Sequence, residues 1–325
     1  MTGKLSETRS INYKFSKMPE LPEVTTTVSG LNKVLKNLSI DDVWSDWEKL
    51  VKFPSFKKFK KDITGKKFIE ARRRGKNILI ELSGDKTLLV HMKMTGHIMY
   101  GKWRKAERLN LLKAEVEPLK HIWTWIPEDG GHLNDPYNRF IHLLFQLSNG
   151  HQLVLCDARK FAKVALFDTD KLEDIAYIKE LGPEPLKKNM TGATLMIRLM
   201  KKPTWPIKQA LLNQGLIAGI GNIYSDEILW ATGVHPLQKV STISSAKMKR
   251  MFKTMREILQ KSIKLGGDSM SDYRNIHGER GGFQKIHNVY RKTGEKCPKK
   301  DGGVIRRIKV AGRSSHFCDT HQKLN

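Results

Sequence analysis

The segment Leu181-Gly182-Pro183-Glu184-Pro185-Leu186 divides the chain into two parts with different sequence patterns. Before it, short apolar runs are separated by turn signals, such as Asn149-Gly150 between residues 140–147 and 152–156, which is typical of β-hairpins. After it, apolar residues recur at helical spacing, for example over residues 248–263. The prolines and glycine of the segment fit neither period and indicate an interdomain linker. We therefore expect an α+β protein, with a β-sandwich domain followed by a helical domain.

Basic residues outnumber acidic ones along the whole chain. The 325 residues include 59 Lys and Arg against 33 Asp and Glu, a formal net charge of +26. Nucleic acid is the polyanion expected to balance such a charge, although a ribosomal protein would share it. No run of about 18 apolar residues predicts a membrane span, and residues 1–17 lack the apolar stretch of a secretion signal. The three cysteines, Cys156, Cys297 and Cys318, form no even disulfide framework, which favours a reducing compartment and a cytoplasmic location.

A proline directly follows a methionine at Met18-Pro19-Glu20. In a chain that begins at Pro19, the proline nitrogen is a secondary amine with a pKa of roughly 8, partly neutral at physiological pH. Such an amine can attack a carbonyl-like carbon to form an iminium, and the adjacent Glu20 can transfer a proton. The same local pattern more often simply starts a helix, because proline fits the first helical turn. Apolar residues at helical spacing from Leu21 onward place the motif at a helix start in either case.

The stretch Pro19-Glu20-Leu21-Pro22-Glu23-Val24 resembles the amino terminus of formamidopyrimidine-DNA glycosylases, in the family that includes endonuclease VIII. The resemblance recurs along the chain as far as Gln322, except near residues 101–135. It implies a bifunctional DNA glycosylase/AP lyase in which Pro19 is the nucleophile and Glu20 the acid. It also implies a leading helix on the β-sandwich, then a helix–two-turns–helix module and a zinc-ribbon-like β-hairpin. The implied partner is double-stranded DNA with oxidised bases or abasic sites, bound by a monomer.

The resemblance also gives roles to residues of the first half. Lys76, in a basic turn, would act at the DNA backbone near the lesion. Met94 would fill the gap left by an everted nucleotide, whose flipping costs a few kcal/mol of stacking. Arg159 would hydrogen-bond the orphaned partner base, and Phe161 would wedge between base pairs. His142 stands alone where the family often has two histidines that contact phosphate. Without the resemblance, the basic turn around Lys76 would be interpreted as a solvated loop. Met94 and Phe161 would be assigned to the core, and Arg159 would be an ordinary exposed arginine.

In the second half, the run Gly219-Ile220-Gly221-Asn222 precedes a helix, and backbone N–H groups at such a start suit a phosphate. The resemblance places Lys208 and Asn222 on phosphate-binding positions. It places Arg313 beside the lesion phosphates, where it would assist the second elimination. Residues 272–283 contain three glycines, which predicts a mobile loop. The family uses this segment to cover the everted purine.

The C-terminal residues Cys297, Asp301, Cys318 and His321 have a spacing similar to that of four-cysteine zinc ribbons. Asp301 and His321 stand where cysteines are common, and both residue types can bind zinc tetrahedrally. We therefore expect one structural Zn²⁺. The alternative is a ribbon that keeps its hairpin shape without metal.

These patterns predict five segments. Residues 1–17 form an extension that is outside the fold or untranslated, and residues 18–180 form the catalytic β-sandwich domain. Residues 181–188 are the linker, 189–284 the helical DNA-binding domain, and 285–325 the zinc-ribbon-like hairpin. Residues 101–135 are interpreted as an insertion, with a short helix over 111–119 and with Trp123 and Trp125 covering the sheet.

The position of Pro19 within the full sequence raises a chemical conflict. Inside a peptide bond its nitrogen is an amide, and resonance removes the lone pair that an attack needs. We therefore expect translation to begin at Met18, or residues 1–18 to be removed. Two alternatives stay open: an endonuclease VIII-like glycosylase for oxidised pyrimidines, and an inactive binder of damaged DNA if Pro19 stays blocked. Met94, Arg159 and Phe161 together favour the purine enzyme.

Overall fold

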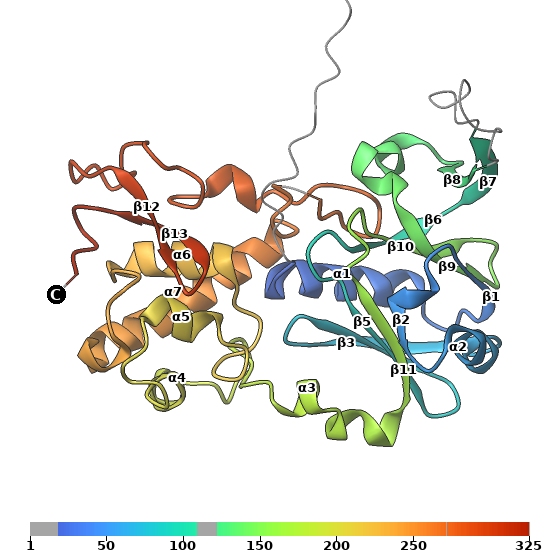
Figure 1. The fold of residues 1–325 in the computed structure, drawn as a ribbon, viewed down its shortest axis with the longest axis horizontal. Helices are drawn as coiled ribbons and strands as arrows, with labels where there is room; N and C mark the ends of the chain where they lie inside the picture. The colour runs from blue at the N-terminus through green and yellow to red at the C-terminus, as the bar shows by residue number, and fades with distance from the viewer. Residues whose placement is uncertain (1–18, 109–121, 271, 325) are drawn as a thin grey trace, which may run out of the picture.

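The computed structural model of the chain describes residues 19–108, 122–270 and 272–324. The predicted extension over residues 1–17 and the predicted helix over 111–119 lie outside the described residues. Figure 1 shows a strand-rich half and a helical half side by side, as the two sequence patterns predict. The α+β fold expected from the sequence is confirmed.

Two β-sheets form the N-terminal half. The first is antiparallel with the order β1-β9-β10-β6, and the second has the order β2-β11-β5-β4-β3, in which only β2 and β11 run parallel. The strands of the first sheet are β1 (Ile40–Ser45), β6 (His97–Gly101), β9 (Ile141–Leu147) and β10 (Gln152–Cys156). Those of the second are β2 (Val51–Phe53), β3 (Phe68–Arg74), β4 (Asn77–Leu82), β5 (Lys86–His91) and β11 (Lys163–Asp168).

Alternating apolar side chains from both sheets meet in one core. Ile78 and Ile80 of β4 pack with Leu143 and Phe145 of β9, because every second residue of a strand points to the same face. Helix α1 (Leu21–Val34) adds Val24 and Leu31 to this core, and α2 (Phe56–Ile63) adds Phe59 and Ile63. The β-sandwich with a leading helix therefore forms as predicted.

The segment over residues 101–135 adds a second antiparallel hairpin, β7 (Trp103–Arg108) with β8 (Ile122–Pro127), which the sequence analysis did not predict. Trp125 packs edge-on against Trp44 of β1, with ring centroids 5.4 Å apart. The side chain of Trp123 lies outside the described residues. Two short 3₁₀ turns follow, η3 (Gly131–Asn134) and η4 (Pro136–Arg139).

Helices dominate the second half, around their own core. They are α4 (Gly192–Leu199), α5 (Ile207–Leu212), α6 (Asn222–Thr232) and α7 (Ser245–Lys264), and the short α3 (Ala176–Lys179) precedes the linker. Helix α7 starts three residues earlier than predicted, because the Ser244 side chain accepts a hydrogen bond from the Lys247 N–H and caps the helix. Among the described residues, no helix is long and apolar enough to span a bilayer.

The chain ends in the hairpin β12 (Ile305–Val310) and β13 (Arg313–Cys318), which lies beside α6 (Figure 1). Short 3₁₀ turns occur at η1 (Glu48–Leu50), η5 (Thr169–Asp174), η6 (Val240–Thr242) and η7 (Phe283–Ile286). The start of α1 is tied to the helical half, since the Leu21 N–H donates to the Gly219 carbonyl at 3.0 Å. The Pro19-Glu20 motif therefore lies at the junction of the two halves.

Candidate active site

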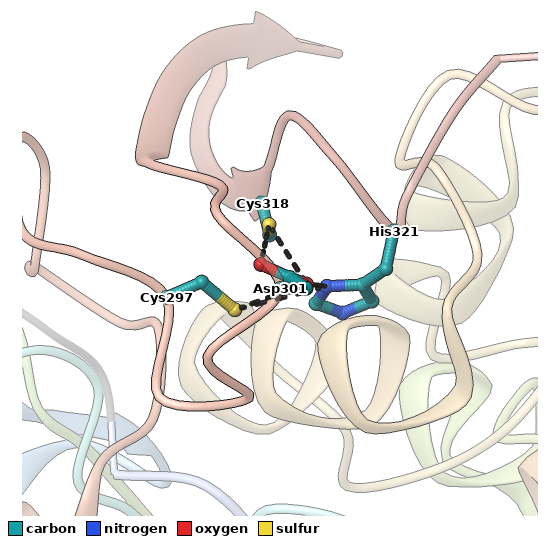
Figure 2. Close-up of side chains that lie close together, drawn as sticks. All are labelled: Cys297, Asp301, Cys318 and His321. Carbon is teal, nitrogen blue, oxygen red and sulfur yellow. Dashed lines mark hydrogen bonds and ion pairs between the residues drawn. The ribbon is translucent and has the colours of Figure 1, made fainter.

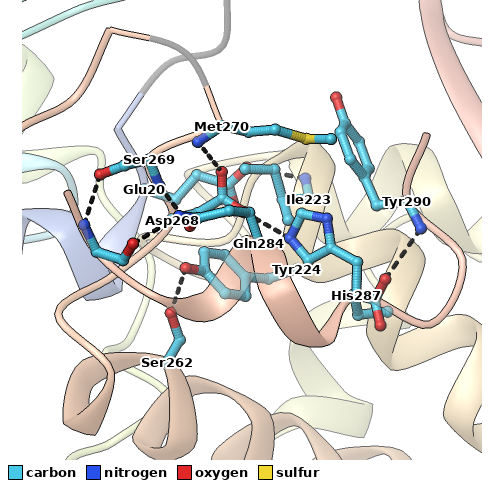
Figure 3. Close-up of polar contacts among 12 residues, drawn as sticks. Glu20, Ile223, Tyr224, Ser262, Asp268, Ser269, Met270, Gln284, His287 and Tyr290 are labelled. Carbon is cyan, nitrogen blue, oxygen red and sulfur yellow. Dashed lines mark hydrogen bonds and ion pairs between the residues drawn. The ribbon is translucent and has the colours of Figure 1, made fainter.

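Glu20 lies at the N-terminal end of α1 and is buried, with 2% of its surface exposed. Its Oε1 accepts the N–H of Ile223, in the first turn of α6, at 2.9 Å (Figure 3). A β-carbon at Gly221 would lie only 2.3 Å from the Glu20 carboxyl carbon, so only glycine allows this approach. The glycine-rich turn expected to suit a phosphate thus binds the Glu20 carboxylate with one of its N–H groups.

The other carboxyl oxygen, Oε2, is buried and has no hydrogen-bond partner among the described residues. Burial raises the pKa of Glu20, against the opposing effect of the Lys76 ammonium and the backbone N–H groups of Ile223 and Gly221. A buried carboxyl with a raised pKa holds its proton closer to neutral pH and can serve as an acid.

Lys76 and Arg313 face Glu20 across a pocket of about 310 Å³. Lys76 lies in the β3–β4 turn and is 9% exposed, while Arg313 is the first residue of strand β13. Burial lowers the pKa of Lys76, which favours the neutral amine. Asn222 and Tyr290 also line the pocket. One acid and two basic side chains from distant parts of the sequence therefore line one pocket, and the acid directly follows Pro19 in the chain.

The linker holds the turn that precedes Lys76. Glu184 accepts the Gly75 N–H at 2.6 Å and pairs with Arg73 at 2.6 Å, and it is 5% exposed. Arg74 donates to the carbonyls of Leu181 and Gly182. Lys76 is thus positioned by contacts between the two halves of the protein.

Asp226 of α6 fixes the position of the β13 hairpin. It accepts hydrogen bonds from the Ser315 hydroxyl at 2.7 Å and the His316 N–H at 3.0 Å. Lys208 donates to the same carboxylate at 2.5 Å and to the Asn222 carbonyl at 3.1 Å. The Lys208 ammonium is fully buried, so it supports the pocket from behind rather than lining it.

Asp157 holds together two turns at one edge of the sandwich. Its carboxylate accepts the N–H groups of Arg159, Phe161 and Ala162, and it also bonds the Thr95 hydroxyl. Met94 precedes Thr95 and is partly exposed. The guanidinium of Arg159 stacks over the Phe161 ring at 4.6 Å, and Phe161 is 46% exposed. The structure therefore brings the sequences around Met94, Arg159 and Phe161 together and leaves an aromatic ring projecting from the surface.

His142 lies apart from these residues, in β9. It is 7% exposed, and its Nδ1 lies 2.7 Å from Asp46. The contact with Asp46 and the burial give this histidine a structural environment, and a phosphate contact stays a prediction.

Four side chains converge below the β12–β13 hairpin (Figure 2). They offer ligand atoms that all lie within 4.8 Å of one another, from Cys297, Asp301, Cys318 and His321. The Cys297 sulfur is 3.5 Å from Asp301 Oδ2 and 3.7 Å from His321 Nδ1, and the Cys318 sulfur is 3.5 Å from Asp301. Ligand atoms about 2.0–2.3 Å from a tetrahedral zinc ion are themselves separated by roughly 3.3–3.8 Å.

A further contact orients the histidine of this cluster. His321 Nε2 lies 3.0 Å from the Trp230 carbonyl, to which it donates when Nδ1 is unprotonated. This leaves the Nδ1 lone pair directed at the cluster, as in histidine ligands held by a backbone acceptor. The donor types fit a tetrahedral metal site. The sulfur distances fit it too, whereas His321 Nδ1 lies 2.5 Å from Asp301 Oδ2, so these two ligand atoms would separate to admit an ion.

Comparisons with known proteins agree with this geometry. Residues 18–164 match the formamidopyrimidine-DNA glycosylase N-terminal domain, and residues 181–274 match the formamidopyrimidine-DNA glycosylase H2TH domain. The chain belongs to the formamidopyrimidine-DNA glycosylase family. The resemblance seen in the sequence is therefore confirmed, and with it the enzyme class, a bifunctional glycosylase/AP lyase.

Relatives in this family align over nearly the whole chain. The formamidopyrimidine-DNA glycosylase of Pelotomaculum thermopropionicum is 36% identical over 94% of this chain and 100% of its own length. The formamidopyrimidine-DNA glycosylase of Lactococcus lactis subsp. cremoris is 35% identical over 94% of this chain and 100% of its own length.

Solved structures give the same result. The Lactococcus lactis Fpg bound to DNA containing an abasic site superposes with a TM-score of 0.77, at 32% identity over 94% of this chain and 99% of that one. MutM in complex with DNA containing carbocyclic 8-oxo-G also superposes with a TM-score of 0.77. It is 33% identical over 94% of this chain and 100% of that one.

Several residues that line the pocket received no role from the sequence, among them His91 and Tyr290. His91 ends β5, and burial together with nearby lysines lowers its pKa to about 3. Its Nδ1 accepts the Lys93 N–H at 3.0 Å, so Nε2 carries the proton of the neutral ring. Tyr290 lies in a loop without periodicity. Neither residue stands in a pattern that marks it, although His91 does end a predicted strand beside Met94.

Glu23 was also given no role of its own, yet it organises the first turn of α1. Its Oε2 accepts the Glu20 N–H at 2.8 Å, and its Oε1 accepts the Tyr224 hydroxyl at 2.5 Å and the Asp268 N–H at 2.7 Å. Burial, and then the nearby Glu20 and Asp268 carboxylates, raise its pKa to about 7. Glu23 therefore joins α1 to α6 and to the loop after α7.

Proposed function

We propose that this protein excises oxidised purines from duplex DNA and then cuts the strand at the resulting abasic site, with Pro19 as the nucleophile. The observation that supports this most directly is the buried Glu20 carboxyl, which has one oxygen without a partner and a raised pKa, in the pocket that Lys76 and Arg313 also line. An acid of this kind, one residue after a nucleophilic amine, suits the removal of a base from a sugar.

The reaction proceeds in three stages. The secondary amine of a free Pro19 attacks the anomeric carbon of the everted nucleotide, while Glu20 protonates the sugar ring oxygen. The base leaves, and the nitrogen lone pair forms an iminium with the opened sugar. β-Elimination then breaks the bond to the 3′ oxygen and δ-elimination the bond to the 5′ oxygen, so that the strand is cut on both sides of the sugar. Lys76 and Arg313 supply charge at the adjacent phosphates.

The DNA-binding surface follows the same positions. The solved relatives hold abasic-site and 8-oxo-G DNA, and we infer that this chain binds such duplexes as a monomer. Met94 fills the space left by the everted nucleotide, and Phe161 wedges between the neighbouring base pairs. Arg159 hydrogen-bonds the orphaned partner base. Asn222 and Arg313 contact phosphates from the pocket wall, and Lys208 supports them. Residues 272–283 cover the everted base.

The hairpin contains a structural zinc ion in this proposal. Cys297, Asp301, Cys318 and His321 would hold it, and the ion would fix the β12–β13 hairpin relative to α6. The geometry of the four ligand atoms supports this assignment. Arg313, on the same hairpin, would depend on the metal for its position.

The test is a comparison of substrates with a protein whose first residue is Pro19. Duplexes with a single oxidised guanine should be cut to leave phosphates at both ends of the gap. Duplexes with an oxidised pyrimidine should react at least tenfold more slowly. Preference for the pyrimidine would favour the endonuclease VIII-like alternative, and binding without cleavage of any duplex would favour an inactive binder.

A further inference from the structure

The loop after α7, residues 268–284, is attached to the catalytic helix. The Asp268 N–H donates to Glu23 Oε1, and the Tyr273 hydroxyl donates to the Glu23 carbonyl at 3.0 Å. Ile276 packs so closely on Gly30 of α1 that a β-carbon there would lie 2.8 Å from it. Figure 3 shows the start of the loop tied further by Asp268 to His287 and by Ser269 to Gln284. The loop, predicted to be mobile from its glycines, has buried anchors on α1.

A second set of contacts ties the loop to the segment over residues 101–135, which departs from the family pattern. Arg274 is fully buried, and its guanidinium forms a fork to Asp135, with Nε–Oδ2 and Nη2–Oδ1 distances of 3.0 Å each. It also lies over the Tyr137 ring at 4.9 Å and donates to the Tyr273 carbonyl at 2.8 Å. Arg274 is fully buried and Asp135 half-buried, and a bidentate pair of this kind is among the strongest and most directional contacts available to arginine.

Further hydrogen bonds beside this pair also join the loop to the strand and turns around Asp135. The Tyr100 N–H donates to the Ile276 carbonyl at 2.7 Å, and Asn138 reaches the carbonyls of His132 and Gly278 at 2.8 and 3.5 Å. A β-carbon at Gly278 would lie 2.8 Å from the His132 carbonyl oxygen. The loop thus bridges α1, which bears Glu20, and the segment that ends at Asp135.

We propose that Asp135 and Arg274 form a positioning clamp, through which the turn between η3 and η4 holds the loop over residues 272–284 against the catalytic helix and so sets the rate of base excision. The inference rests on the proposed function, in which this loop covers the everted base. Neutralising Asp135 removes the bidentate ion pair of a fully buried guanidinium, and an opening of the loop restores the hydration of that group. The clamp acts on the base and not on the sugar, so an abasic site needs no clamp.

The experiment compares two rates in Asp135→Asn, which keeps the shape of the side chain but removes its charge. Base excision from an oxidised-guanine duplex, measured in a single turnover, should fall at least tenfold. Strand cleavage of a preformed abasic duplex should change less than twofold. Asp168→Asn is the control and should leave both rates unchanged, because it removes a half-exposed carboxylate of β11 that pairs with Lys86 of β5 and with Lys171. An equal fall in the two rates, or no change in either, would overturn the proposal.

Limited trypsin digestion measures how readily the loop opens in the absence of DNA. Arg280 is an exposed residue of the loop, and cleavage after it should be at least fivefold faster in Asp135→Asn than in the control. Unchanged cleavage would contradict the clamp. If Asp135→Asn does not fold, Arg274→Lys, which keeps the charge but lacks the fork, should show the same split between the two rates. A wild-type protein that digests slowly but excises no base would refute the proposed function while leaving the clamp intact.

Discussion

At the scale of single residues, Glu20 owes its chemical character to groups far along the chain. The motif places it beside Pro19, and that proximity was visible in the sequence. Its burial, its bond to Ile223 and the close approach of Gly221 involve residues about 200 positions away. The burial raises the pKa of Glu20 although the backbone N–H groups of Ile223 and Gly221 oppose the shift, and the local pattern could indicate neither effect.

Replacing this acid gives the first prediction. Glu20→Gln should lower the single-turnover rate of base excision by about 10²–10⁴-fold, the usual contribution of a general acid. Affinity for a damaged duplex should change less than threefold, because the amide keeps the acceptor for the Ile223 N–H. Both quantities are measured on the same oxidised-guanine duplex. A parallel loss of affinity would mean that Glu20 mainly maintains the fold.

Glu23 gives a prediction about pH. Its pKa is about 7 in the folded protein and near 4.5 when unfolded, so the folded state binds more protons between these values. Its contribution to stability is therefore present below about pH 4.5 and is lost as pH rises to 7, by on the order of 3 kcal/mol. Urea unfolding at pH 5 and pH 8 should show this decline in the wild type and a smaller one in Glu23→Gln. Glu70→Gln, at an exposed site on β3, should behave as wild type.

At the scale of elements, local patterns predicted the strands beside clear turn signals and the helices at the proline motif and near residue 248, and they missed others such as β1, β11 and α2. The Asn149-Gly150 turn joins β9 and β10 as expected, and α1 begins at the proline motif. The β7–β8 hairpin was missed, since its strands are separated by a segment without a turn signal. The burial of Lys208 was missed as well, because its partner Asp226 lies on another helix.

The pair Lys208 and Arg313 can be separated by salt dependence. Each phosphate contact contributes about one unit to the slope of log affinity against log salt. Arg313→Ala should lower that slope by about one unit on any duplex. The sequence predicts the same for Lys208→Ala, whereas its burial predicts a lower melting temperature and an unchanged slope. A reduced slope with an unchanged melting temperature would restore Lys208 as a direct phosphate contact.

The hairpin gives a prediction about metal. Protein purified without added zinc should contain about one equivalent, because four closed ligands hold a structural ion. Asp301→Ala should release the metal at a lower chelator concentration, and Asp301→Cys should retain it. Mass spectrometry under native conditions measures the bound metal. A folded, active protein without zinc would show that packing alone maintains the hairpin.

At the scale of the whole molecule, the pocket depends on how the two halves join. Glu184 of the linker positions the turn before Lys76, Asp226 positions the hairpin of Arg313, and Glu23 connects α1 to the helical half. None of these long-range contacts has a local sequence signature. The motifs identified the family, whereas the arrangement of its acid and bases required the folded structure.

The most direct test of the central claim is covalent trapping at Pro19. An oxidised-guanine duplex is incubated with borohydride and with either of two forms of the protein, one starting at Pro19 and one retaining Met1, each verified by intact mass. The amine of the first form should be trapped as a stable adduct that maps to Pro19, and the second form should bind the duplex without forming it. Full lyase activity and an adduct from a protein proven to retain Met1 would contradict the account and implicate a lysine amine such as Lys76.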